Sequence, residues 1–202
     1  PVWLEAWGLD RSDIGFFLGA ATIARIVGST VIPALADRYD RDAMAIRIGN
    51  APCSWGVEFA GDPRNPDWRK VLKDCAEAGY TGIELGPVGF MPEDPAILAD
   101  ALAETGLELI GGVVFRAFHD PDQWEDVLDG AVRTCKALTA HGARHLVLID
   151  SISPRRAPTA GRADEAEQMD QAEWEAFRDR IATVAKMGAE DYGLTVGMHA
   201  HA

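Results

Sequence analysis

The sequence contains little positive charge. Its 19 lysines and arginines stand against 32 aspartates and glutamates, which gives a net charge of -13 at pH 7. Nucleic acids and anionic membrane surfaces are bound through clustered cations that neutralise phosphates, so this balance argues against both classes of partner. A small polyol, a sugar or a metal ion remains open as a ligand.

Cysteine is also scarce. Cys53, Cys75 and Cys135 are widely spaced, and no C-x-x-C pair occurs. An odd number of isolated thiols is typical of a cytoplasmic protein without a disulfide framework. We expect Cys75 and Cys135 to be buried on helix faces, and Cys53 to lie in a loop after the first strand.

Residues 14–36 form an apolar run that lacks charge except for Arg25 and is long enough to span a bilayer. With the Asp37-Arg38 pair that follows, the run resembles the opening helices of a major facilitator superfamily transporter. The alternative is an amphipathic helix packed on the next domain. Arg25 favours that alternative, because a lone charge at the bilayer centre costs ~2.5–3.5 kcal/mol. Membrane association is expected only if residues 14–36 insert.

The character of the sequence changes near residue 43. Residues 1–43 read as an apolar helical segment, whereas residues 44–202 begin afresh at Met44 and read as a soluble domain. We expect a composite chain with these two domains, produced either by a misjoined reading frame or by a fusion.

The soluble part repeats one local pattern, in which an amphipathic helix ends at a glycine and a short apolar strand follows. Gly79, Gly106, Gly142 and Gly193 occupy these joints, where a left-handed glycine can close a helix. Alternating helices and strands predict a parallel α/β sheet. The expected strands cover residues 45–49, 82–85, 107–115, 145–149 and 194–198, and the expected helices cover residues 67–78, 95–105, 122–140 and 172–191.

Two parallel folds fit this pattern. A doubly wound sheet is disfavoured, because no glycine-rich phosphate turn follows the first strand. A (β/α)8 barrel of ~250 residues has the same spacing between strands along its sequence as the strands expected here. We therefore expect a partial (β/α)8 TIM barrel that contains the first five strands, preceded by the N-terminal apolar segment.

Polar side chains follow the expected strands at their carboxyl ends, where parallel sheets collect their chemistry. Glu84 can transfer a proton or cap a loop. Asp150 can bind hydroxyls or anchor a loop through backbone N–H groups. His199 and His201 lie on one face of a strand end, which suits a metal ligand beside a base, although a solvated terminus would look the same. Arg116 and His119 follow the third strand beside aromatic residues and suit a polar ligand.

Several motifs together resemble a known family. Asn50-Ala-Pro-Cys-Ser-Trp55, the tract around Glu84-Leu-Gly-Pro, residues 115–120 and His199-Ala-His201 are similar to the xylose-isomerase-like barrels of the sugar phosphate isomerase/epimerase superfamily. Within that superfamily the sequence looks most like the inosose dehydratases of inositol catabolism.

The resemblance implies an isomerase, epimerase or dehydratase that removes a proton next to the carbonyl of a sugar or cyclitol. It implies a divalent metal (Mn, Co, Mg or Zn), expected only in the completed barrel, and leaves a homo-oligomer open. A non-catalytic sugar-binding barrel and a fragment of a transporter fusion are the alternatives. The implied roles are catalytic for Glu84 and His201, substrate-binding for Asn50, Trp55, Arg116, His119 and Asp150, and metal-binding for His199.

Overall fold

The computed structural model describes residues 48–162 and 164–199. By its internal contacts the chain divides into residues 1–46 and 47–202. The predicted apolar helix over residues 14–36, the predicted boundary near residue 43, most of the first strand and His201 therefore lie outside the described residues and stay predictions. None of the helices within the described ranges is long and apolar enough to cross a membrane.

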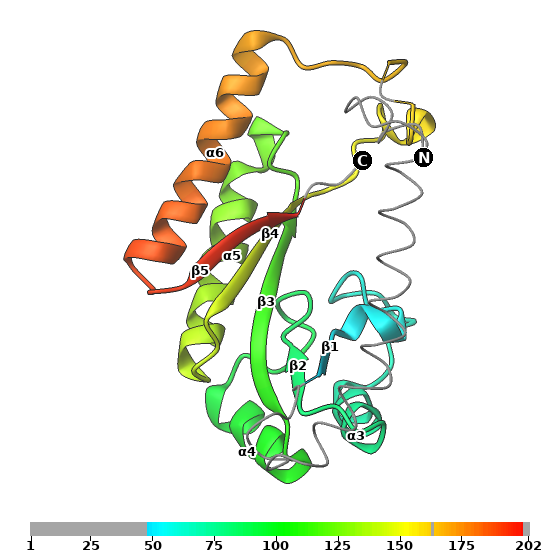
Figure 1. The fold of residues 1–202 in the computed structure, drawn as a ribbon, viewed down its shortest axis with the longest axis vertical. Coiled ribbons are helices and arrows are strands. Elements are labelled where there is room, and N and C mark those ends of the chain that lie inside the picture. The colour runs from blue at the N-terminus through cyan, green and yellow to red at the C-terminus, as the bar shows by residue number, and fades with distance from the viewer. Residues whose placement is uncertain (1–47, 163, 200–202) are drawn as a thin grey trace, which may run out of the picture. The chain divides into compact units, whose positions relative to one another are not determined.

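All strands pair in parallel, and each pairs with the strand that precedes it in the sequence (Figure 1). This unreversed order differs from a doubly wound sheet, in which the order switches direction. It confirms the prediction of a partial (β/α)8 barrel with five strands. The strands are β1 (Gly49–Asn50), β2 (Gly82–Glu84), β3 (Glu108–Arg116), β4 (His145–Asp150) and β5 (Thr195–His199).

The helices agree with the predicted ranges to within two residues. Side chains at the N-caps set the starts, since Asp67, Asp94 and Asp170 each accept hydrogen bonds from backbone N–H groups of the first turn. Gly106 closes α4 with a φ of 70°, as the helix–glycine pattern predicted. The helices are α3 (Trp68–Glu77), α4 (Pro95–Thr105), α5 (Trp124–Ala140) and α6 (Gln171–Glu190), with short 3-10 turns η2 (Pro52–Trp55), η3 (Pro121–Gln123) and η4 (Ala157–Thr159).

The predicted helix over residues 122–140 differs at its start. Pro121 and Asp120 open a separate 3-10 turn, in which the Asp120 side chain accepts from the Asp122 N–H, and the α-helix begins only at Trp124. The extra turn sets the path of the chain between β3 and α5, which carries His119.

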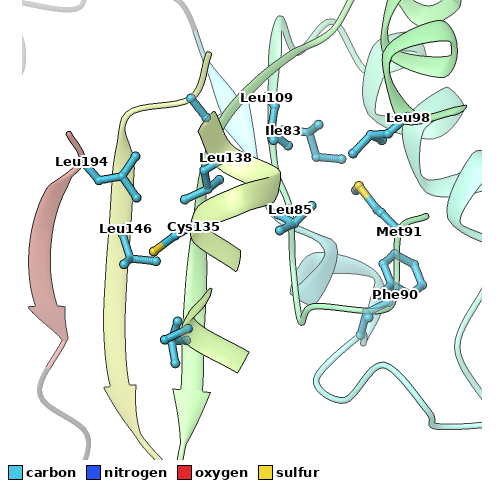
Figure 2. Close-up of a cluster of buried hydrophobic side chains, with 14 of the residues drawn as sticks. Ile83, Leu85, Phe90, Met91, Leu98, Leu109, Cys135, Leu138, Leu146 and Leu194 are labelled. Atoms are coloured by element: carbon cyan, nitrogen blue, oxygen red, sulfur yellow. The ribbon is translucent and has the colours of Figure 1, made fainter. Parts of the chain in front are cut away.

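The core lies between the helices and one face of the sheet (Figure 2). Ile83 of β2 and Leu109 of β3 face Leu98 of α4, and all three are buried. Gly112 allows β3 to approach α5 closely, because a Cβ at this position would lie 3.2 Å from Leu138 Cδ2. Cys75 and Cys135 are buried, as predicted, and Cys53 lies exposed in the turn after β1.

The opposite face of the sheet carries Glu84 and His199. Ile83 and Leu85 are buried in the helix-facing core, so alternation along β2 directs Glu84 away from the helices. A Cβ built on Gly188 of α6 would contact Val196, so by the same alternation His199 also lies on the face away from α6. In a closed barrel this face forms the interior.

Candidate functional site at the carboxyl ends of the strands

His119 and Asp150 form a hydrogen-bonded pair at the carboxyl ends of β3 and β4. The Nδ1 atom of His119 lies 3.0 Å from both Oδ1 and Oδ2 of Asp150. The main-chain N–H of His119 also donates to Asp150 Oδ1, at 3.1 Å. Asp150 is the last residue of β4, so the rigid strand end fixes the carboxylate that holds the neighbouring loop.

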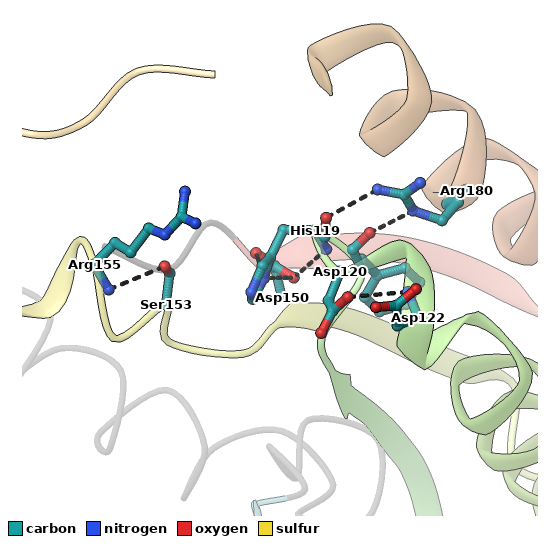
Figure 3. Close-up of polar contacts among 8 residues, drawn as sticks. His119, Asp120, Asp122, Asp150, Ser153, Arg155 and Arg180 are labelled. Atoms are coloured by element: carbon teal, nitrogen blue, oxygen red, sulfur yellow. Dashed lines mark hydrogen bonds and ion pairs between the residues drawn. The ribbon is translucent and has the colours of Figure 1, made fainter. Parts of the chain in front are cut away.

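The loop that bears His119 is held from a second side by α6. Arg180 donates from Nε to the Phe118 carbonyl at 2.6 Å and from Nη2 to the His119 carbonyl at 3.1 Å (Figure 3). The Phe118 side chain is fully buried. His119 is thereby tied at its ring, its N–H and its carbonyl, which leaves the imidazole little freedom to reorient.

An open cavity of about 500 Å³ lies beside this pair. Its walls come from residues 119–121, Asp150, residues 153–156, residues 167–169 and Glu173 at the start of α6. Arg155 pairs with Glu167 at 3.2 Å, and the buried Nε of Arg156 has no hydrogen-bond partner in the part of the chain that the structure describes. The wall offers both hydrogen-bond donors and acceptors, which suits a ligand rich in hydroxyl groups.

Glu84 ends β2 outside the wall of this cavity. Its carboxylate is partly buried, and burial raises the pKa of Glu84 above its usual value. Within residues 48–162 and 164–199, no side chain forms a hydrogen bond or ion pair with it. A partly buried carboxylate at a strand end whose pKa moves toward neutrality is suited to proton transfer.

Arg116 turns toward α5. Its Nε lies 2.9 Å from Asp126 Oδ2, and the guanidinium packs over Gly130, at 3.3 Å from the position of a Cβ there. The structure therefore does not bring Arg116 together with His119, although the two residues are neighbours in the sequence.

Asn50 and Trp55 belong to the turn after β1. Asn50 Oδ1 accepts from the Ala51 N–H at 2.8 Å and from Ser54 Oγ at 2.6 Å, so its side chain shapes the turn. The indole N–H of Trp55 donates to Asp74 of α3 at 3.1 Å. These hydrogen bonds stabilise the turn after β1 and its contact with α3.

His199 is exposed at the end of β5, opposite Ile149 of β4 in the register. Among the described residues no group of three or more His, Cys, Asp or Glu side chains is arranged to hold a metal ion. The described residues thus offer His199 as a single imidazole ligand and do not make up a metal site by themselves.

Sequence reasoning missed Arg180 and the contribution of Glu173 to the cavity. Both lie on α6, which the sequence marks only as an amphipathic helix. Arg180 contacts carbonyl groups 61 and 62 residues earlier in the chain. A local sequence pattern cannot predict a contact over such a separation.

An unreversed parallel sheet with polar groups at its carboxyl ends defines a βα-barrel protein. The sequence matches the family described as "Xylose isomerase-like TIM barrel" over residues 72–202. The chain belongs to this family.

Two curated relatives are similar over most of this chain. The rhizopine catabolism protein MocC of Rhizobium meliloti is 28% identical over 165 residues, which is 78% of this chain and 48% of MocC. The 4-hydroxybenzoate transporter PcaK of Pseudomonas putida is 26% identical over 155 residues, which is 76% of this chain and 32% of PcaK. The chain thus spans about half the length of MocC and about a third of that of PcaK. The PcaK match covers more of the chain than residues 1–43, so it does not single out that segment as transporter-like.

Solved structures share the fold at low sequence identity. A xylose isomerase-like TIM barrel protein from Mycobacterium smegmatis in complex with magnesium gives a TM-score of 0.57 at 18% identity, over 77% of this chain and 55% of its own. The IOLI protein with a bound zinc atom gives 0.56 at 12% identity, over 77% and 51%. D-Psicose 3-epimerase from Clostridium cellulolyticum H10 gives 0.52 at 18% identity, over 75% and 51%. Identities this low show the fold alone.

Proposed function

We propose that this chain belongs to a sugar or cyclitol isomerase, epimerase or dehydratase, similar to an inosose dehydratase. The observation that carries the proposal is Glu84, a partly buried carboxylate with a raised pKa at the carboxyl end of a barrel strand. Membership of the xylose isomerase-like family supports the proposal. The similarity to MocC, a rhizopine catabolism protein, supports a catabolic role.

In the proposed reaction Glu84 removes the proton from the carbon next to the substrate carbonyl. The C–H bond breaks, and its electron pair moves into the enolate while the carboxylate takes the proton. Return of the proton gives isomerisation or epimerisation, and loss of a hydroxyl from the next carbon gives dehydration. We assign the second acid/base role to His201, which the sequence puts two residues beyond His199.

The proposed substrate contacts come from polar residues at or just after the carboxyl ends of the strands. The His119–Asp150 pair lines the cavity and can bind a hydroxyl group. Asn50, Trp55 and Arg116 are proposed as further substrate contacts. Each now bonds to a neighbouring group of the protein, and we propose that the ligand replaces part of those bonds.

We propose His199 as one ligand of a divalent metal, chosen from Mn, Co, Mg or Zn. Its exposed imidazole on the interior face has suitable donor chemistry. The solved relatives that hold zinc and magnesium support a metal of this charge. When bound, such a cation stabilises negative charge that develops on the carbonyl oxygen. The remaining ligands would come from the further strands of the completed barrel.

Solvent deuterium exchange tests the role of Glu84. Because the metal is expected only in the completed barrel, the protein used is the full-length barrel that contains this chain. It is incubated with an inosose or a ketose in D2O at saturating Mn²⁺, and deuterium on the carbon next to the carbonyl is measured by NMR. Glu84→Gln should slow exchange by about 10²–10⁴-fold and leave metal affinity unchanged. His199→Ala should weaken metal binding, and Glu77→Gln on the exposed face of α3 is the matched control.

Two outcomes contradict the proposal. Unchanged exchange in Glu84→Gln at metal saturation would remove Glu84 from the chemistry. Sugar binding by equilibrium dialysis without any exchange in the unmodified protein would favour a non-catalytic sugar-binding barrel.

A further inference from the structure

We infer that His119 is a proton-transfer residue, which exchanges a proton through Nε2 with a hydroxyl oxygen of the substrate, and that Asp150 and Arg180 are its positioning residues. The inference deepens the proposed function and rests on it, because the hydroxyl belongs to the same sugar or cyclitol. It gives His119 a chemical role in addition to binding.

The hydrogen bonds fix the tautomer of His119. A carboxylate offers only acceptors, and both oxygens of Asp150 lie 3.0 Å from Nδ1, so Nδ1 carries the ring proton. Asp150 Oδ1 also accepts a hydrogen bond from the main-chain N–H of His119, which holds the carboxylate in place beside the ring. In the neutral ring Nε2 then has a lone pair, and it forms no hydrogen bond within the part of the chain that the structure describes.

The ring borders the cavity. His119 lines it, and the His119 side chain keeps 22% of its surface exposed. Since Asp150 occupies Nδ1, Nε2 is the polar ring atom that a ligand in the cavity can reach. Arg180 holds the two carbonyls on either side of the His119 backbone N–H, so the loop cannot swing the ring away without breaking both bonds.

The other charged groups of the cavity are engaged with the protein. The carboxylates accept from protein donors: Asp120 from the Asp122 N–H, Glu173 from the Asp170 N–H and Glu167 from Arg155. Arg156 lines the wall with a buried Nε. Of the titratable groups in this wall, the His119 ring therefore has the clearest unused site for proton transfer.

The step balances without an added reactant. Glu84 first takes the C–H proton, which leaves an enolate whose charge lies on the carbonyl oxygen. Nε2 then accepts the proton of the hydroxyl on the deprotonated carbon, the O–H bond breaks, and its electron pair forms the new C=O bond. The electron pair of the enol C=C bond takes the proton back from Glu84 at the former carbonyl carbon. Asp150 stabilises the imidazolium formed. The imidazolium then returns the proton to the former carbonyl oxygen, and neutral His119 is restored.

The tautomer is tested without substrate. Long-range ¹H–¹⁵N NMR of the ¹⁵N-labelled protein, assigned with His119→Gln, should show Nδ1 protonated and Nε2 bare. In Asp150→Asn the amide can donate to Nδ1, so the proton should move to Nε2. A protonated Nε2 in the neutral ring of the unmodified protein would overturn the inference even if deuterium exchange proceeds.

Kinetics test the role in turnover. His119→Gln should lower kcat by about 10²–10⁴-fold and remove one limb of the pH profile. Asp150→Asn and Arg180→Lys should lower kcat more than they raise KM, whereas Asp129→Asn on α5 is the matched control. A change confined to KM would reduce His119 to a binding residue. Absence of exchange and turnover in the unmodified protein would overturn the proposed function, and this inference with it.

Discussion

At the scale of single residues, Glu84 should make stability depend on pH. Burial raises the pKa of Glu84 in the folded chain above its value in the unfolded chain, so folding favours the protonated form. The carboxylate therefore costs no stability below the unfolded pKa. The cost grows as the pH rises through the window between the two pKa values and is complete above the folded pKa.

Glu84→Gln removes this titration, so its melting temperature relative to the unmodified protein should be higher at pH 7 than at pH 4. Differential scanning calorimetry at the two pH values measures the difference. A gain that is the same at both values, or larger at pH 4, would contradict the assignment. A stabilised variant that also exchanges deuterium slowly would identify Glu84 as a residue kept for function at a cost in stability.

Sequence reasoning located residues better than it located their contacts. It put Glu84, Asp150 and His199 at strand ends, because the end of an apolar run marks a position along the chain. It could not anticipate that Arg116 turns to Asp126 or that Trp55 donates to Asp74. Those partners are chosen by packing between elements, which local periodicity does not encode.

At the scale of elements, the packing of β3 on α5 depends on a missing side chain. A Cβ at Gly112 would lie 3.2 Å from Leu138 Cδ2, 3.3 Å from Thr134 Cγ2 and 3.4 Å from Leu85 Cβ. All three neighbours are buried and have little room to move. Gly112→Ala should therefore destabilise the fold by about 1–3 kcal/mol.

Gly197 of β5 is the matched control, because among the described residues no atom beyond its chain neighbours lies within 4 Å of the position that a Cβ would occupy there. Gly197→Ala should be neutral or stabilising by about 0.4–1 kcal/mol. Urea denaturation followed by circular dichroism compares the two variants. Equal effects would show that the contact between β3 and α5 is looser than these distances indicate.

The elements themselves were largely predictable. The range of α4 follows from the sequence, because Asp94 and Pro95 mark the start of a helix and Gly106 marks its end. The register shift between Ile83 and Glu84 was not predictable, since it arises from pairing with β3 and leaves no mark in a three-residue strand.

At the scale of the whole molecule, β5 lies at one end of the strand order among the described residues. Met198 on this strand is 50% exposed. Unpaired backbone groups and exposed apolar side chains on an edge strand favour pairing with another chain. A chain limited to these five strands should therefore associate as its concentration rises.

Met198→Lys should weaken this association by about tenfold, which corresponds to about 1.4 kcal/mol, because a charged side chain protects an edge. Trp174→Lys, at a helical position that is 51% exposed, controls for loss of apolar surface. Sedimentation velocity at two concentrations measures the effect. An equal reduction of the association by both variants would assign it to nonspecific contacts between exposed apolar side chains instead of the strand edge.

The unreversed strand order also bears on how the chain acquires its structure during synthesis. Each strand pairs with its immediate predecessor, so every pairing closes a loop of only one helix and its connections. Short closures lose little chain entropy and favour fast folding. A nascent chain leaving the ribosome can therefore add one βα unit at a time, with each finished strand serving as the template for the next.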